Sequence, residues 1–121
     1  MEIFGRQINF SYNVLSQKEL AKICPGRNIK RLNELLISDD TVEMYESAQK
    51  IIIALNAGYE KAAHYNNPEY VPNPVTIDML DCLDETTFIE LLNDSLKSMK
   101  QKQEIETEPD PNVESPKTVS N

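Results

Sequence analysis

Only three residues of this chain could take part in cysteine–histidine chemistry. His64 is the single histidine, and Cys24 and Cys82 are the two cysteines. Such chemistry requires the imidazole within hydrogen-bonding distance of a thiol. The simpler interpretation is that both cysteines fill the core and that His64 lies at a helix C-terminus, where positive charge is favourable. We therefore expect no enzymatic activity and name no catalytic residue.

Zinc binding is the second chemistry to consider, because the same three residues could combine with Asp78 or Asp81. These residues lack the close pairwise spacing that is typical of zinc ligands. The acidic pairs Asp39-Asp40 and Asp84-Glu85 lie where helices are predicted to begin, and carboxylates there cap free N–H groups. The three glycines are well separated, so no phosphate-binding loop is predicted. The sequence thus predicts no metal ion and no cofactor.

A small basic cluster, Arg27, Lys30 and Arg31, follows the Pro25-Gly26 turn. Two short helices around such a cluster could form a helix-turn-helix that reads DNA. The formal net charge of the chain is −8, however, and such a surface repels phosphate backbones and anionic membranes. We therefore expect no nucleic acid and no membrane as partners. The cluster is interpreted as a solvated helix face that meets an acidic partner or the acidic tail of the chain.

The elements that would position these residues begin with a β-hairpin. Residues 3–12 are rich in strand-forming side chains, and residues 5–7 supply a turn. A helix is predicted to start at the capping box Ser16–Glu19 and to end at Pro25-Gly26. A shorter helix follows over residues 28–37. It would present one apolar face, formed by Ile29, Leu32, Leu35 and Leu36.

The longest predicted helix runs from its capping residue Asp40 to about His64. Its apolar side chains recur at alternating intervals of three and four residues, which is the helical period. They are Tyr45, Ala48, Ile52, Leu55, Tyr59 and Ala62, with Ile51 widening the face. Gly58 interrupts the pattern at a cost of about 1 kcal/mol relative to alanine, which indicates either a close helix–helix contact or a kink.

The loop after this helix, residues 65–74, contains three prolines and is predicted to be extended and stiff. A loop of this kind needs side chains that fix it to the helices. We expect Tyr65, Tyr70 and Val71 to pin it to the body of the protein.

Two further helices are predicted, a short one capped by Thr76 and a last one that is capped by Asp84 and ends in the basic stretch 97–102. Residues 103–121 contain five acidic residues, one lysine, three prolines and no aromatic side chain. Such a segment cannot bury enough apolar surface to offset the entropy of ordering. The predicted fold is therefore mostly α: a small helical domain over residues 1–102, with a short N-terminal β-hairpin, and a disordered acidic C-terminal tail over 103–121.

The expected location of the protein is intracellular. The first ten residues contain no basic region followed by an apolar run, so no secretory signal is predicted. No stretch reaches the roughly 18 to 20 apolar residues that cross a bilayer. Two cysteines outside any CxxC motif are typical of free thiols in a reducing compartment.

Three segments of the sequence resemble those of a known family. They are the Cys-Pro-Gly turn at 24–26, the helix segment Leu-Asn-Ala-Gly-Tyr-Glu at 55–60 and the loop Asn-Pro-Glu-Tyr-Val-Pro-Asn-Pro-Val-Thr at 67–76. The three segments lie between a predicted N-terminal strand pair and a predicted final helix pair. In this order they resemble the corresponding segments of the tail assembly chaperones of long-tailed, siphovirus-type phages and prophages of Gram-positive bacteria. The similarity covers about residues 6–100 and includes no catalytic signature.

The resemblance implies a protein made in the host cytoplasm during phage morphogenesis and absent from the mature virion. It implies that the protein binds the tape measure protein, keeps it soluble and recruits tail tube subunits, which displace it as they polymerise. It also implies that a longer form can arise by a ribosomal frameshift. Self-association is a further expectation.

A partner surface is predicted on the long helix and the adjoining loop, because grooves between amphipathic helices hold apolar helical faces and aromatic residues are enriched where proteins meet. Its residues are Tyr45, Ile52, Leu55, Tyr59, Tyr65 and Tyr70. For the four residues on the helix, the simpler interpretation is that they form the core. Other functions stay open: an acidic adaptor or inhibitor that binds a host protein, a DNA-binding regulator, or a small enzyme.

Overall fold

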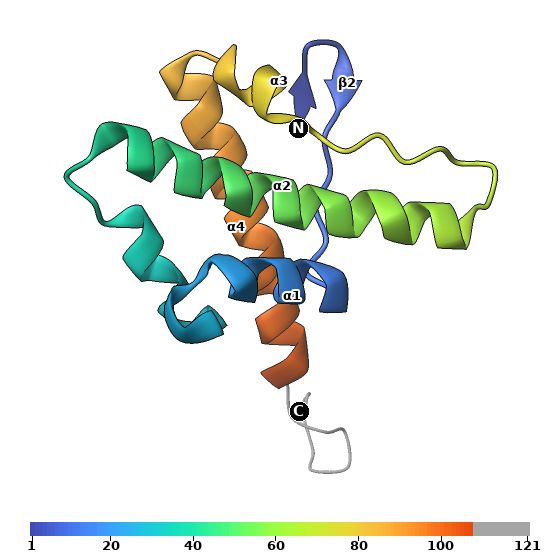
Figure 1. The fold of residues 1–121 in the computed structure, drawn as a ribbon. Coiled ribbons are helices and arrows are strands. Elements are labelled where there is room, and N and C mark those ends of the chain that lie inside the picture. Colours follow the sequence, from blue (N-terminus) through green and yellow to red (C-terminus); the bar gives the residue numbers. More distant parts are fainter. Residues whose placement is uncertain (108–121) are drawn as a thin grey trace, which may run out of the picture.

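The computed structural model describes the backbone of residues 1–107 and the side chains of residues 1–100. Its N-terminal part comprises β1 (Glu2–Ile3), β2 (Arg6–Gln7), α1 (Val14–Ile23) and two 3₁₀ helices, η1 (Pro25–Arg27) and η2 (Ile29–Leu36). The remaining elements are α2 (Thr41–Asn66), α3 (Ile77–Asp81) and α4 (Glu85–Thr107) (Figure 1). The predicted mostly α fold with a short N-terminal β-hairpin is confirmed. The part of the predicted tail beyond residue 107 lies outside the described residues.

The hairpin turns one residue earlier than predicted. β1 and β2 are antiparallel, with Ile3 opposite Arg6. The two turn residues are Phe4-Gly5, and both have positive φ, 51° and 78°. Positive φ at both central residues is the requirement of a type I′ turn, whose twist matches that of the flanking strands. Arg6 and Gln7, predicted to lie in the turn, therefore form β2.

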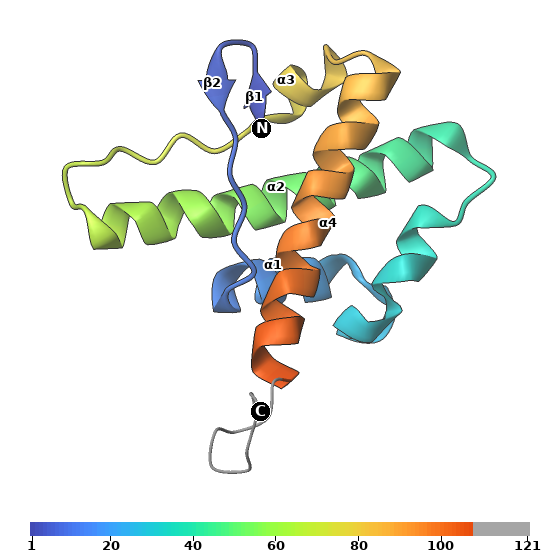
Figure 2. The ribbon, with the colours of Figure 1, turned by 180° about the vertical axis from the view of Figure 1, so that it is seen from behind.

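The chain after β2 is extended but pairs with no strand, so the strand predicted up to Tyr12 is wrong. This segment instead crosses α2, where Figure 2 shows it in front of the helix. The Ser11 N–H donates to the carbonyl oxygen of Leu55 at 3.1 Å. Ile8 is fully buried. The alternating pattern thus reflects packing against a helix, which needs the same side-chain alternation as packing in a sheet.

Helix α1 begins three residues earlier than predicted. Asn13 is its N-cap: its Oδ1 accepts from the Ser16 N–H at 3.1 Å, and the Ser16 Oγ accepts from the Asn13 N–H at 2.8 Å. Ser16 is thus the third helical residue of a capping box rather than the cap. The helix ends before Pro25-Gly26, as predicted. The helix predicted over 28–37 is the 3₁₀ helix η2, of which only Leu32 is fully buried.

Asp40 caps α2 as predicted, since its Oδ1 accepts from the Glu43 N–H at 3.0 Å. The return bond of a capping box does not form, because the Glu43 carboxylate accepts from the Ser38 hydroxyl at 2.7 Å instead. Helix α2 continues two residues past His64, to Asn66.

The last two helices have the predicted caps. Thr76 caps α3 through its hydroxyl, and Asp84 caps α4 by accepting from the Thr87 N–H at 2.7 Å. This bond holds the pKa of the Asp84 carboxyl below its usual range. Helix α4 runs to Thr107, so the predicted end at residue 102 is wrong. Among the side chains described after α2, the buried apolar ones are Val75, Leu80, Phe88 and Leu91.

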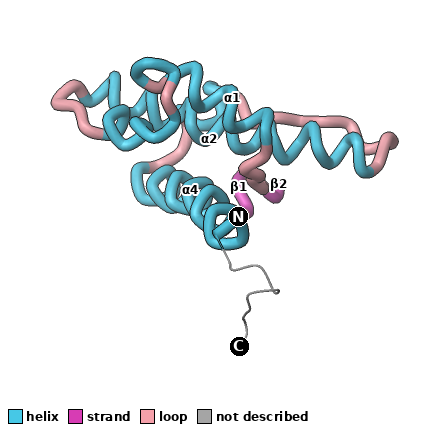
Figure 3. The backbone as a smooth tube through the Cα atoms, turned by 90° about the horizontal axis from the view of Figure 1, so that it is seen from below, coloured by secondary structure: helices cyan, strands magenta, loops and turns pink. Residues whose placement is uncertain are grey.

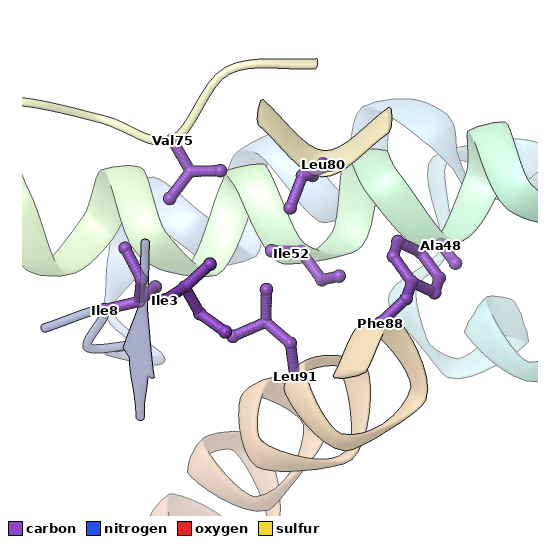
Figure 4. Packing of buried hydrophobic residues seen from close by; sticks show 8 residues of the cluster. All are labelled: Ile3, Ile8, Ala48, Ile52, Val75, Leu80, Phe88 and Leu91. Atoms are coloured by element: carbon purple, nitrogen blue, oxygen red, sulfur yellow. The ribbon is translucent and has the colours of Figure 1, made fainter. Parts of the chain in front are cut away.

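Helix α2 lies at the centre of the molecule and contributes to two apolar clusters. Seen from below, α4 and the hairpin form one layer and α1 and α2 form the other (Figure 3). Between the layers lies the first cluster, which consists of Ile3, Ile8, Ala48, Ile52, Val75, Leu80, Phe88 and Leu91 (Figure 4). The second lies between α1, η2 and α2 and consists of Leu20, Cys24, Leu32, Ile51, Ala54 and Leu55.

Candidate partner-binding groove

The cysteines, the histidine and the aspartates that could take part in catalysis or metal binding are not gathered into a site. Cys24 is buried in the second cluster, and burial raises the pKa of its thiol, with a further contribution from the Glu34 charge. Cys82 is exposed at the end of α3, so the expectation that it fills the core is wrong. Within the described residues, no group of three or more His, Cys, Asp or Glu side chains could hold a metal ion.

A hydrogen bond joins His64 to the proline-rich loop. The Nδ1 of His64 lies 2.8 Å from the carbonyl oxygen of Tyr70. This bond explains the histidine without a catalytic role, since it ties the last turn of α2 to the returning chain. Within the described residues, no thiol is bonded to His64.

Two of the six predicted partner-binding residues are core residues. The side chains of Ile52 and Leu55 are fully buried, one in each apolar cluster. They therefore cannot contact a partner on the folded protein, and they are removed from the predicted surface. The interpretation of the apolar stripe as core holds for this pair.

Tyr45 and Tyr59 are half-buried and lie at the edges of two separate depressions. The ring of Tyr45 packs against Phe88 with a centroid distance of 5.2 Å. It borders an apolar hollow of about 230 Å³ beside Ile89 and Leu92. Tyr59 borders another of about 330 Å³, beside Phe10 and Lys97. The stripe thus does not form a continuous surface.

The loop tyrosines have opposite environments. Tyr65 is 84% exposed and Val71 is 79% exposed, so the expectation that they pin the loop is wrong. Tyr70 does pin it, because its hydroxyl donates to Oε1 of Glu60 at 2.5 Å. This hydrogen bond, together with partial burial, raises the pKa of Tyr70. Of the six predicted residues, Tyr65 is the one that is largely exposed, and its ring makes an edge contact with the imidazole of His64 at a centroid distance of 5.6 Å.

Glu60 is the centre of the loop attachment. Its side chain is only 1% exposed. Besides the Tyr70 hydroxyl, its Oε1 accepts from the Asn73 N–H at 2.9 Å. The carbonyl oxygen of Asn73 in turn accepts from the guanidinium of Arg6. A buried carboxylate must be satisfied by donors of this kind, and here the donors are the loop itself.

One turn earlier, Asn56 joins the loop to the N-terminal segment. Its buried amide donates to the Asn9 carbonyl oxygen at 2.9 Å and accepts from the Val75 N–H at 2.8 Å. Both bonds satisfy backbone groups that no strand would pair. Asn56 and Glu60 explain why polar residues interrupt the apolar section of α2. The helix segment 55–60, which carries the family resemblance, thus has a structural role.

The largest of these cavities is an open groove between α1 and α2, of about 550 Å³. Its apolar floor and walls are formed by Leu15, Ile23, Ile53, Ala54, Ala57 and Ile77. Leu15, Ile23, Ile53 and Ala57 are half-buried, and Ile77 is 42% exposed. We call this the α1–α2 groove. By helical spacing its α2 residues lie on roughly the opposite side of α2 from Ile52, which faces α4.

The rim of the α1–α2 groove is charged. Lys50 and Lys61 stand on the α2 wall, and Glu19 stands on the α1 wall. Glu19 is neutralised by Lys22, whose Nζ lies 2.9 Å from its Oε2. Both α2 lysines are exposed, and neither has an ion-pair or hydrogen-bond partner in the part of the chain whose side chains are described. The groove therefore combines an apolar floor with two uncompensated positive charges on an acidic protein.

The run Ile51-Ile52-Ile53 is the sequence signal for this groove. Consecutive residues of a helix point about 100° apart, so three successive isoleucines cannot share one face. Ile51 packs toward α1 and η2, Ile52 is buried in the cluster that includes α4, and Ile53 lines the groove while also packing against the edge of that cluster. Helical periodicity predicts Ile51 as a widening of the core face but does not indicate that Ile53 borders a groove on another side of the helix.

Comparison with known proteins found no matching family, no matching curated protein and no matching solved structure. Within the described residues, no helix has the length and apolar character required to cross a membrane.

Proposed function

We propose that this protein is a tail assembly chaperone of a long-tailed phage or prophage, and that the α1–α2 groove holds a helical segment of the tape measure protein. The observation that carries the proposal is the groove itself, an apolar surface left open between two helices of a small helical domain. A groove of this kind receives the apolar face of an amphipathic helix. The resemblance of segments 24–26, 55–60 and 67–76 supplies the biological context.

The proposal assigns the other predicted features to later steps of assembly. Recruitment of tail tube subunits requires a second surface, and the exposed Tyr65 and Val71 at the end of α2 are available for it. The acidic residues of segment 103–121 contribute about half of the net charge of −8. In this function the protein acts in the host cytoplasm, is displaced as the tube subunits polymerise, and is absent from the mature virion.

The experiment uses the native gene with its downstream DNA, expressed with an N-terminal tag, and identifies every retained protein by mass spectrometry. We expect a very long helical protein encoded just downstream, and an extended form of the chain if a frameshift occurs. The variant Ala57→Gln places a polar side chain in the groove without adding charge, and should lose the long protein. Val42→Gln is the matched control, because Val42 is 65% exposed and lies outside the groove.

Two outcomes contradict the proposal. Recovery of the chain alone, or with one host protein and no phage protein, would favour the acidic adaptor or inhibitor. Equal capture by the Ala57→Gln and wild-type proteins would show that the groove does not hold the tape measure protein. Circular dichroism of both variants establishes that loss of capture is not loss of folding.

A further inference from the structure

We infer that the α1–α2 groove selects an amphipathic helix that carries acidic residues along one edge, about three helical turns apart. This inference rests on the proposed function of the groove and specifies the chemistry of its occupant. The apolar floor alone would accept any amphipathic helix, whereas the charges of the rim distinguish between them.

The two lysines are positioned to contact acidic residues along one edge of a bound helix. Lys50 and Lys61 are eleven residues apart in α2. At 1.5 Å per residue this separation is about 16 Å, close to three turns, so both side chains lie on the same side of the helix. Between them, Ile53, Ala54 and Ala57 form the floor. A helix that lies along α2 would bring acidic residues of the same spacing next to both lysines.

The surrounding charges support an acidic rather than a basic occupant. The carboxylate of Glu19, on the opposite wall, is occupied by Lys22 at 2.9 Å. Asp78, which follows Ile77 in the sequence, is exposed but does not line the groove. Lys50 and Lys61 are the basic side chains that line the groove, and Glu19 is the acidic one. An acidic helix would pair with the two lysines, while a basic helix would be repelled.

The test measures binding of two labelled peptides to the full-length protein by fluorescence anisotropy at low salt. Both peptides are amphipathic helices of about 18 residues with a leucine face, and they carry either two Glu or two Lys residues eleven positions apart on one edge. We expect the Glu peptide to bind about tenfold more tightly than the Lys peptide, with the difference falling as salt is added. The double variant Lys50→Glu/Lys61→Glu should reverse this preference.

The matched control is Lys30→Glu/Lys100→Glu, which changes the net charge equally at two exposed lysines outside the groove. It should leave the preference unchanged. Equal binding of the two peptides, no binding of either, or an equal effect of the control variant would each overturn the inference.

If Glu108→Gln/Asp110→Asn/Glu114→Gln raises peptide affinity, the occupant is the tail of the chain. If the groove variant changes the sedimentation of the protein, the occupant is a second copy. Either result also overturns the inference.

The peptide test and the capture experiment can give negative results independently of each other, so failure of the inference can be told apart from failure of the proposed function. Loss of tape measure capture by Ala57→Gln, together with no effect of the lysine reversal on peptide binding, would leave the proposed function standing and reject the charge selection. Charge-selective peptide binding without capture of a phage protein would retain the groove chemistry and reject the proposed function.

Discussion

A Cβ atom added to Gly58 would lie 2.7 Å from the Oδ1 of Asn13, the residue that caps α1. The amide of Asn13 also donates to the Gly58 carbonyl oxygen at 2.9 Å. The glycine therefore marks the point where the start of α1 is held against α2. Of the two explanations that the sequence leaves open, close contact and kink, the structure supports close contact.

We predict that Gly58→Ala destabilises the protein despite the higher helix propensity of alanine. The new methyl group would also meet the Ser11 carbonyl oxygen at 3.0 Å. Overpacking costs about 1–3 kcal/mol, which outweighs the gain of about 1 kcal/mol in propensity. Urea unfolding measures the net effect. Ala63→Gly, at a half-buried position in the same helix, gives an upper limit for the propensity contribution. A Gly58→Ala protein as stable as wild type would contradict the contact.

Removal of the Tyr70 hydroxyl should loosen the proline-rich loop. The Glu60 carboxylate accepts hydrogen bonds from the Tyr70 hydroxyl and from the Asn73 N–H. The variant Tyr70→Phe removes the first and leaves the second. A hydrogen bond to a charged group contributes about 1.5–3 kcal/mol. We therefore expect a loss of that order in unfolding free energy and faster hydrogen exchange in residues 67–76. Tyr65→Phe is the matched control, because Tyr65 is 84% exposed, and equal behaviour of the two variants would contradict this role of Glu60.

The two cysteines should react with thiol reagents at very different rates. Cys82 is exposed, whereas Cys24 is buried and burial raises the pKa of its thiol. Since the thiolate is the reactive form, Cys24 should react only when the protein opens. Titration with a chromogenic disulfide should show one fast and one slow equivalent, and Cys82→Ser should abolish the fast one. Two fast equivalents would mean that the second apolar cluster is not closed.

Phe4→Asn should stabilise the hairpin. Phe4 has a φ of 51° and is 66% exposed, so it has a strained backbone and little packing in return. Asparagine followed by glycine is strongly preferred in type I′ turns. A gain of about 0.5–1 kcal/mol in unfolding free energy is expected. Phe4→Ala retains the strain and serves as the control; a destabilised Phe4→Asn protein would show that the phenyl ring makes a stabilising contact.

The Asp84 cap should make stability depend on pH in the acidic range. The hydrogen bond from Thr87 lowers the pKa of Asp84 in the folded state. The stabilisation is thus fully present above the pKa that Asp84 has in the unfolded chain, about 3.9. It is lost as the pH falls through the lower pKa that Asp84 has in the folded protein. The melting temperatures of wild type and Asp84→Ala should therefore differ at pH 7 and converge below about pH 4. Asp39→Ala is the control, and a pH-independent difference would exclude the charged cap.

Sequence patterns were sufficient for the helices and their caps where the signal is local. Asp40, Thr76 and Asp84 were each predicted as caps, and each accepts the expected backbone N–H. The start of α1 was misplaced because Ser16, a residue type preferred at N-caps, is here the third helical residue, while the equally good capping residue Asn13 is the cap. The long strand at residues 8–12 was wrongly predicted because an extended segment buried on a helix has the same alternation as one buried in a sheet.

The candidate site could be predicted only in part. The prediction of an interhelical surface agrees in kind with the α1–α2 groove, but the groove contains none of the six predicted residues. Periodicity identifies the most apolar face of a helix, and in a central helix that face is the core. Which of the remaining sides stays open depends on where α1, α3 and α4 pack, and one helix does not contain that information.

Three neighbouring isoleucines on α2 have three different environments, with consequences for how such a protein can diversify. Positions 51 and 52 are buried and constrained by the interior of the molecule, whereas the half-buried position 53 both packs against the first apolar cluster and lines the groove. A lineage could therefore follow changes in its partner through substitutions at 57 and the flanking lysines with little effect on folding, while position 53 would have to satisfy both the core and the partner. Recognition and folding can thus evolve largely separately along one helix.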